Sequence, residues 1–241
     1  MPAESNEIIA LVGGTGPMGK SIAAALRKEG QRYRVIGRSQ TKLAQTFGDD
    51  PLAQTTEWDP DDEQSIRNAL RGCGGVVHLL GVPYTSLELH PFLMRRVLDA
   101  ALAEKADRLL LIGTLYVYGR AQSEHVTEAH PREPHTFKGH MRKAQEDLVL
   151  EAHASGRIRT TILRLPDFYG PNVSNSLIND LFVAAGPSSS AQSTGRTSSC
   201  SSPTLARSWQ SCSTLPPPSD EPGTWAAPAS PHSASWRRCI T

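Results

Sequence analysis

The chain has 241 residues, enough for one large domain or two small ones, and its formal net charge of +1 gives no electrostatic argument for binding nucleic acid or a membrane surface. Its polar, acidic N-terminus is unlike a signal peptide, no apolar run reaches the length of a membrane span, and its four cysteines form no disulfide or metal framework. These features predict a cytoplasmic protein that binds neither nucleic acid nor a membrane.

A glycine-rich turn lies near the start of the chain, between an expected strand and an expected helix. The apolar run Ile8–Val12 is typical of a buried parallel strand, and Met18–Glu29 carries apolar residues at helical spacing. The turn, Gly-Gly-Thr-Gly-Pro-Met-Gly at residues 13–19, lets the backbone approach a pyrophosphate, and the helix N-terminus supplies N–H donors. This stretch predicts dinucleotide binding, with an ordinary turn between strand and helix as the alternative.

Strand-like and helix-like segments alternate from residue 6 to residue 186. Further strands are expected at residues 34–37, 55–58, 76–80, 108–112 and 160–165, and further helices at residues 59–70, 91–104 and 138–155. Asp59 is expected to cap the first of these helices, and the glycines at residues 72–75 to end it. The alternation predicts an α/β fold with a doubly wound parallel sheet of the Rossmann type, whose strands end along one ligand crevice.

The composition changes abruptly after Gly186. Residues 187–241 contain no Lys and no Val and show no helical or strand period, yet they hold three of the four Trp and three of the four Cys residues. We therefore expect a nucleotide-binding domain over residues 1–186 and a disordered, low-complexity tail over residues 187–241. The tail is interpreted either as a natural linker or as an out-of-frame segment, and the enrichment in Trp and Cys favours a frameshift.

Several motifs together resemble the extended short-chain dehydrogenase/reductase superfamily, in its NAD-dependent epimerase/dehydratase branch. They are the glycine turn at 13–19, Asp59, and the segments 76–81, 114–119, 138–146 and 164–171. The resemblance covers roughly residues 8–181 and implies a Rossmann-type fold, a bound NAD or NADP, and a substrate lobe built after residue 171. Because that last segment is here mostly the tail, we expect the C-terminal substrate lobe to be incomplete.

The choice of cofactor depends on the residue that follows the second expected strand. An acidic residue there would bind the ribose 2′-hydroxyl of NAD, whereas Arg38 suits the 2′-phosphate of NADP. NADP is therefore expected rather than NAD, with a solvated loop cation as the alternative for Arg38. The resemblance places Asp59 near the adenine, in addition to its capping role. The cofactor contacts that it implies are Gly13, Thr15, Gly16, Pro17, Met18, Gly19, Arg38, Asp59, Leu79, Leu80, Gly81, Thr114, Arg142 and Pro166.

The reaction centre departs from the pattern of the superfamily, which uses a Ser or Thr hydroxyl, a Tyr acid/base and a Lys four residues after the Tyr. Thr114 falls on the hydroxyl position, but the Tyr is replaced by Lys138 and the Lys by Arg142. Residues at i and i+4 share a helix face, so both cations are expected to face the crevice. Arg142 could bind the ribose but cannot shuttle a proton, and Lys138 could be the acid/base. The alternative is that both are exposed cations without a catalytic task.

Other polar and aromatic residues near these motifs have less defined roles. Packing is the expected role of Tyr116 and Tyr118, and Asp167 is either a substrate contact or a turn cap. The histidines at 125, 130, 135 and 140 do not have the spacing of metal ligands on a helix, and no metal is expected. Residues 125–135 are interpreted as a polar active-site loop.

Three functions are therefore open. The first is an NADP-dependent oxidoreductase, or a related epimerase/dehydratase, that acts on a small polar or sugar-derived substrate. The second is a non-catalytic NADP(H)-binding regulator, and the third is an inactive truncated product. The resemblance also implies a homodimer formed through the two long helices, at residues 91–104 and 138–155.

Overall fold

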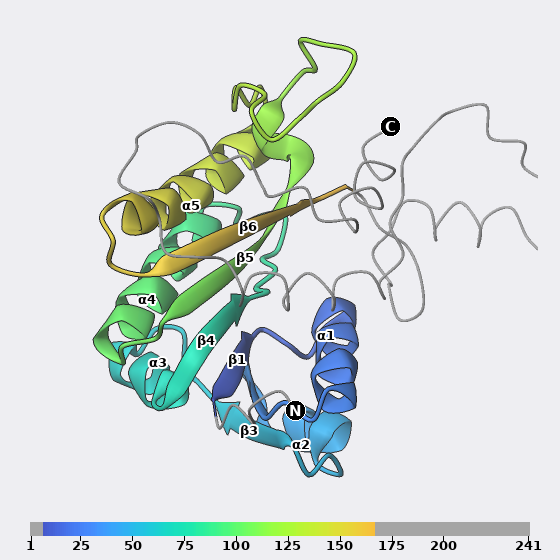
Figure 1. Ribbon diagram of the computed structural model, residues 1–241, viewed down its shortest axis with the longest axis vertical. Coiled ribbons are helices and arrows are strands. Elements are labelled where there is room, and N and C mark those ends of the chain that lie inside the picture. The colour runs from blue at the N-terminus through green and yellow to red at the C-terminus, as the bar shows by residue number, and fades with distance from the viewer. Residues whose placement is uncertain (1–6, 167–241) are drawn as a thin grey trace, which may run out of the picture.

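A computed structural model of the chain describes residues 7–166 (Figure 1). The predictions for residues 187–241, and that for Asp167, lie outside this range, as does the boundary expected at residue 186. The described part contains six parallel strands in the order β3-β2-β1-β4-β5-β6. They are β1 (Ile8–Val12), β2 (Tyr33–Gly37), β3 (Ala53–Glu57), β4 (Cys73–His78), β5 (Arg108–Thr114) and β6 (Arg159–Leu165). The prediction of a doubly wound Rossmann-type sheet is confirmed.

Helices cover both faces of this sheet. They are α1 (Pro17–Lys28), α2 (Gln40–Phe47), α3 (Glu63–Leu70), α4 (Leu89–Ala103) and α5 (Phe137–Ala154), with a 3₁₀ helix η1 (Leu115–Tyr118) after β5. Figure 1 shows α1 and α2 on one face and α3, α4 and α5 on the other. A sheet covered on both sides needs apolar residues on both faces of its central strands, which explains why β1 reads as a continuous apolar run.

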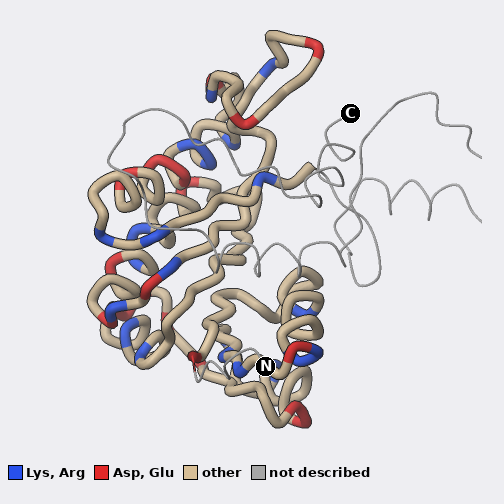
Figure 2. The backbone as a smooth tube through the Cα atoms, viewed as in Figure 1, with Lys and Arg blue, Asp and Glu red and all other residues tan. Residues whose placement is uncertain are grey.

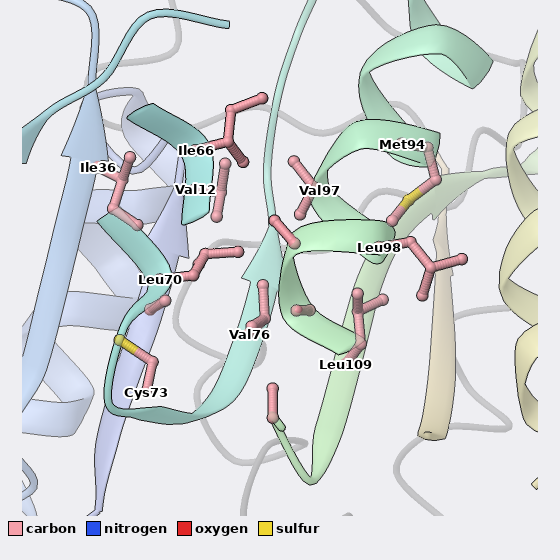
Figure 3. Close-up of a cluster of buried hydrophobic side chains, with 14 of the residues drawn as sticks. Val12, Ile36, Ile66, Leu70, Cys73, Val76, Met94, Val97, Leu98 and Leu109 are labelled. Carbon is pink, nitrogen blue, oxygen red and sulfur yellow. The ribbon is translucent and has the colours of Figure 1, made fainter. Parts of the chain in front are cut away.

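The core consists of two clusters separated by the sheet. Alternate residues of β1 point to opposite faces, so that Ile9 and Leu11 join the cluster under α1 and α2. Ala10 and Val12 join the larger cluster under α3, α4 and α5, part of which is drawn in Figure 3. All four side chains are at most 1% exposed, so β1 is buried on both of its faces.

Two local predictions about α3 were wrong. Asp62, not Asp59, caps this helix, because its carboxylate accepts a hydrogen bond from the backbone N–H of Gln64. Asp59 lies in the preceding turn, where its own carboxylate accepts from the N–H of Asp61. Only Gly72, with φ of +74°, acts as the helix terminator, and the next two glycines belong to β4.

The charged residues of the described part are interspersed, as Figure 2 shows, and neither sign is gathered on one face in this view. Within residues 7–166, no helix combines the length and the apolar character that crossing a bilayer requires.

Candidate nucleotide-binding and reaction site

The glycine turn follows β1 at the point where the strand order of the sheet reverses, which is where open α/β sheets bind ligands. The N–H of Gly13 donates to the carbonyl oxygen of Ile36 at 2.9 Å, and the residue has φ of +83°. A Cβ at this position would lie 2.8 Å from Leu80 Cδ2. Only glycine fits here. Because Gly13 has no side chain, the glycine turn can pack against residues 79–81, which were also predicted to contact the cofactor.

The N-terminus of α1 opens toward this crevice without a side-chain cap. Gly16 is the N-cap residue and Pro17 begins the helix, so the first N–H groups of α1 have no capping side chain. A Cβ on Gly16 would meet no described atom within 4 Å, whereas a Cβ on Gly19 would lie 2.1 Å from the carbonyl oxygen of Gly14. Gly19 therefore permits the helix to pack on the turn, and Gly16 leaves space beside it for a ligand.

A hollow of about 480 Å³ lies beside β2 and β3, at one end of the crevice. Its lining comprises Arg38, Glu57, Trp58, Asp59, Pro60 and Ser65. The structure thus brings Arg38 and Asp59 together, although they come from different strand ends. Glu57, which the sequence analysis did not single out, adds a second carboxylate, so the hollow offers one cation to a phosphate and two carboxylates to the hydroxyls of a ribose.

Thr114 ends β5 on the other side of the glycine turn. Its Oγ1 is buried and has no hydrogen-bond partner among the described residues. A buried hydroxyl without a partner costs free energy unless a ligand or water completes it. Thr114, which is predicted to hold a substrate oxygen, therefore has a hydroxyl that is free to donate a hydrogen bond to a ligand.

Lys138 lies in the first turn of α5 between two tyrosine rings. Its Nζ is 3.2 Å from the hydroxyl oxygen of Tyr84, 4.7 Å from the centre of that ring and 3.9 Å from the centre of the Tyr116 ring. Gly139 makes this possible, because a Cβ there would lie 2.7 Å from the carbonyl oxygen of Tyr116. Lys138 is thus a half-buried cation in contact with aromatic faces.

Arg142 points inward instead, into a cluster of buried polar side chains below the end of β4. Its guanidinium donates to Gln145 Oε1 at 2.9 Å, while its Nε has no partner among the described residues. The same holds for His78 Nε2, His90 Nδ1 and Gln145 Nε2. Burial lowers the pKa of Arg142 to about 10, against the opposing influence of the nearby Glu146. Lys138 contacts the two tyrosine rings, whereas the guanidinium of Arg142 is bonded to the buried Gln145.

The two imidazoles of this cluster are neutral at ordinary pH. His78 and His90 are 1% and 3% exposed, and burial, followed by the charge of Arg142, lowers the pKa of each from 6.5 to about 3. Below about pH 6.5 the unfolded chain binds protons that the folded chain does not, so the free energy of unfolding falls as the pH falls.

We therefore expect the free energy of unfolding to be about 3 kcal/mol lower at about pH 5.5 than at about pH 7.5, from these two groups together. Urea unfolding at the two pH values measures this difference. His78→Asn should halve the loss, whereas His140→Asn, an exposed residue of α5, should leave it unchanged. Equal stability of the unsubstituted chain at both pH values would contradict the burial of neutral imidazoles.

A buried ion-pair network fixes the far side of the site. Glu146, 1% exposed, accepts two hydrogen bonds from Arg164 Nε and one from its Nη2, at 2.8–3.1 Å, and a longer one from Arg132. Burial alone would lower the pKa of Arg164, but the hydrogen bonds and charge of Glu146 raise it. Arg164 Nη1 also donates to the Tyr118 hydroxyl at 2.8 Å. Tyr118 is therefore a buried structural residue, as predicted, and its hydroxyl already accepts a hydrogen bond from Arg164.

A comparison with models of known protein families identifies the family of this chain. The model of the NAD dependent epimerase/dehydratase family matches residues 9–185, which is well over half of the chain. The chain belongs to this family. A comparison with curated protein sequences found no match.

Solved structures of similar fold include a short-chain dehydrogenase/reductase superfamily protein and several enzymes of nucleotide-linked sugars. One is a short-chain dehydrogenase/reductase superfamily protein from Agrobacterium tumefaciens with bound NAD (26% identity, 68% of this chain, 50% of that chain, TM-score 0.58). Another is UDP-N-acetylglucosamine 4-epimerase from Bacillus cereus (19% identity, 86% and 74% coverage, TM-score 0.70). A third is the dTDP-glucose 4,6-dehydratase DesIV from Streptomyces venezuelae, with NAD and TYD bound (20% identity, 68% and 57% coverage, TM-score 0.61). The chain spans about half the length of the first of these.

In this epimerase/dehydratase family member, most of the predicted contacts lie along one edge of the sheet, whereas Arg142 lies in the buried polar cluster; the roles of all of them stay predictions. Arg38 and Asp59 mark one end, residues 13–19 and 79–81 the middle, and Thr114 with Lys138 the other end. Pro166 directly follows β6 and is half-buried. In the loop before α5, His130 is buried and its ring meets Tyr118 edge-on, while His125 and His135 are exposed.

Sequence reasoning missed Tyr84. It lies in the loop between β4 and α4, shortly after Gly81, and is 75% exposed. A large aromatic residue in a loop that follows a strand at the ligand edge was the available signal.

Proposed function

We propose that this chain binds NADP(H) and acts as an oxidoreductase or epimerase/dehydratase on a small polar or sugar-derived substrate. The observation that carries the proposal is the glycine turn at the reversal of the strand order, with space beside Gly16 and an uncapped α1. The residues present fit a dinucleotide, because a Cβ on Gly16 would meet no described atom within 4 Å and Thr114, at the end of β5, retains an unpaired buried hydroxyl. The sugar-nucleotide enzymes among the similar folds support the substrate class.

Four side chains have a defined task in this proposal. Arg38 binds the ribose phosphate, and Asp59 lies on the adenine side of the same hollow. Thr114 donates to the substrate oxygen, and Arg142, whose Nε has no partner among the described residues, binds the nicotinamide ribose. When bound, the nicotinamide supplies hydride transfer.

The preference for NADP depends on Arg38. We expect Arg38→Ala to weaken NADPH binding about 30-fold, since it removes a charge-assisted bond worth about 2 kcal/mol, and to change NADH binding less than about twofold. Titration of the purified chain with each nucleotide, followed by nucleotide fluorescence, measures both dissociation constants.

The matched control is Arg95→Ala, an exposed arginine of α4 outside the hollow, which should change neither constant. Equal loss of NADPH and NADH affinity in Arg38→Ala would contradict the assignment of a phosphate contact. Failure of the unsubstituted chain to bind either nucleotide would contradict the proposed function itself.

A non-catalytic NADP(H)-binding regulator is the second candidate, favoured by the replacement of the Tyr and Lys of the superfamily by Lys138 and Arg142. NADPH oxidation with a panel of aldehydes and sugar nucleotides separates the two. Binding without turnover would favour the regulator. If the chain shows no nucleotide binding and no cooperative thermal transition, the result would favour an inactive truncated product.

We also propose a homodimer through α4 and α5. The two helices pack against each other on the same face of the sheet, and they leave Phe92 and Leu150 exposed. Measurement of the molecular mass in solution tests this, and a monomeric mass would contradict it.

A further inference from the structure

A phenol and a lysine ammonium are paired at the N-terminus of α5, although the tyrosine of the superfamily is missing from the helix itself. The phenol is that of Tyr84, which the loop between β4 and α4 places 3.2 Å from Lys138 Nζ. The two partners therefore come from different elements, and Lys138 occupies the position at which the resemblance implies a tyrosine.

Tyr84 is the most exposed of the four tyrosines that the structure describes, and Tyr116 is next at 40%. The hydroxyl of Tyr118 is bonded to Arg164 and the residue is 6% exposed, and the hydroxyl of Tyr33 is bonded to Asp50 in a residue that is 1% exposed. Tyr84 is 75% exposed and stands at the carboxyl end of β4, on the ligand edge of the sheet. Its hydroxyl contacts only a cation among the described residues.

Lys138 is suited to the partner role. An ammonium carries three donors and no acceptor, so it stabilises a phenolate through a charge-assisted hydrogen bond. The face of the Tyr116 ring, 3.9 Å away, holds the ammonium in place on its other side. The arrangement thus pairs a phenol with an ammonium, as the Tyr–Lys motif of the superfamily does. Here, however, the lysine lies on the helix at the position of the tyrosine, and the tyrosine lies on a loop.

We propose that Tyr84 is the proton-transfer residue of this site and that Lys138 positions it, an inference that rests on the proposed function. In the reduction of a carbonyl, NADPH held at this site would supply the hydride and its two electrons to the substrate carbon, so that the oxidised product is NADP⁺. The substrate oxygen accepts the phenol proton of Tyr84 and becomes a hydroxyl. The phenolate, stabilised by Lys138, regains a proton from solvent.

The test uses Tyr84→Phe in the full chain, because it removes the hydroxyl and keeps the ring. We expect kcat to fall about 100-fold or more, with KM and the NADPH dissociation constant within about twofold. The pH dependence of kcat should flatten as well. The neighbouring Thr85→Ala, exposed in the same loop, is the matched control and should retain kcat.

A second readout does not depend on turnover. Acetylation of Lys138 by acetic anhydride, quantified by peptide mass spectrometry, should be about threefold faster in Tyr84→Phe, because the hydrogen bond is lost, and unchanged in Thr85→Ala. Faster acetylation with undiminished kcat would overturn the catalytic role of Tyr84, and unchanged acetylation would overturn the pairing.

The unsubstituted chain distinguishes failure of this inference from failure of the proposed function. If it binds NADPH and turns over a carbonyl, an undiminished kcat in Tyr84→Phe overturns the inference alone. If it binds NADPH but turns over nothing on the panel, both the catalytic function and the role of Tyr84 are overturned in favour of the regulator.

Discussion

Replacement of Gly19 by alanine is expected to lower the free energy of unfolding by about 3 kcal/mol and to weaken NADPH binding more than about 100-fold. The added Cβ would lie 2.1 Å from the carbonyl oxygen of Gly14 and 2.4 Å from its Cα. These are backbone atoms of the turn, so the clash cannot be relieved by a change of rotamer. Either α1 moves away from the sheet or the turn moves, and both displace the N–H groups of the proposed pyrophosphate site. Urea unfolding and nucleotide titration measure the two effects.

Gly16→Ala separates the two effects of the first substitution. Its Cβ meets no described atom within 4 Å, and its backbone is extended with φ of −78°. Stability should therefore change by less than about 1 kcal/mol, while NADPH binding weakens because the methyl group enters the space left for the pyrophosphate. Unaltered stability of Gly19→Ala would contradict the close packing of α1 on the turn, and undiminished binding by Gly16→Ala would contradict the location of the nucleotide.

Replacement of Glu146 by alanine is expected to lower the free energy of unfolding by about 3–5 kcal/mol. The substitution leaves the guanidinium of Arg164, whose side chain is 16% exposed, without its paired carboxylate, and also removes a partner of Arg132. A charge buried without a partner is costly, whereas the pair itself contributes little net stability. Urea unfolding at neutral pH measures the change.

Glu151→Ala provides the control for Glu146→Ala on the same helix. Glu151 forms a long ion pair of 3.9 Å with Arg157 at the surface, with a carboxylate that is 68% exposed, so its loss should change stability by less than about 0.5 kcal/mol. Similar effects of the two substitutions would show that Glu146 does not hold Arg164 in a buried pair.

The strands and the nucleotide turn were predictable because each is encoded locally. Ile8–Val12 is a continuous apolar run, and the glycines that follow it permit the backbone geometry that the turn requires. The helix α2 was not predicted, because it has only two turns and buries only Leu43 and Phe47, which is too short a pattern for helical periodicity to show. The capping residue of α3 was misplaced because three acids precede that helix, and only the structure shows which one accepts from its N–H groups.

The contacts across the site were less predictable than the elements. The sequence identifies Lys138 as a replacement for the expected tyrosine, but Tyr84 is 54 residues away in the chain and reaches it only through the fold. Likewise, Glu146 was noticed only as a matching position in a motif, and its pairing with Arg164 depends on the adjacency of β5, β6 and α5. Side-chain contacts between elements distant in sequence leave no period or local pattern to detect.

The order of the strands also has a consequence for how the protein is made. β1 pairs with β4, and the N–H of Leu79 bonds to the carbonyl of Val12, so the central strand lacks one of its two neighbours until β4 has been synthesised. At about 5–20 residues per second, roughly 3–13 seconds separate the synthesis of Val12 from that of His78. During that interval an apolar strand is open along one edge on the ribosome, where chaperone binding would compete with aggregation. The strand that precedes the glycine turn is thus also a segment with an open edge during synthesis.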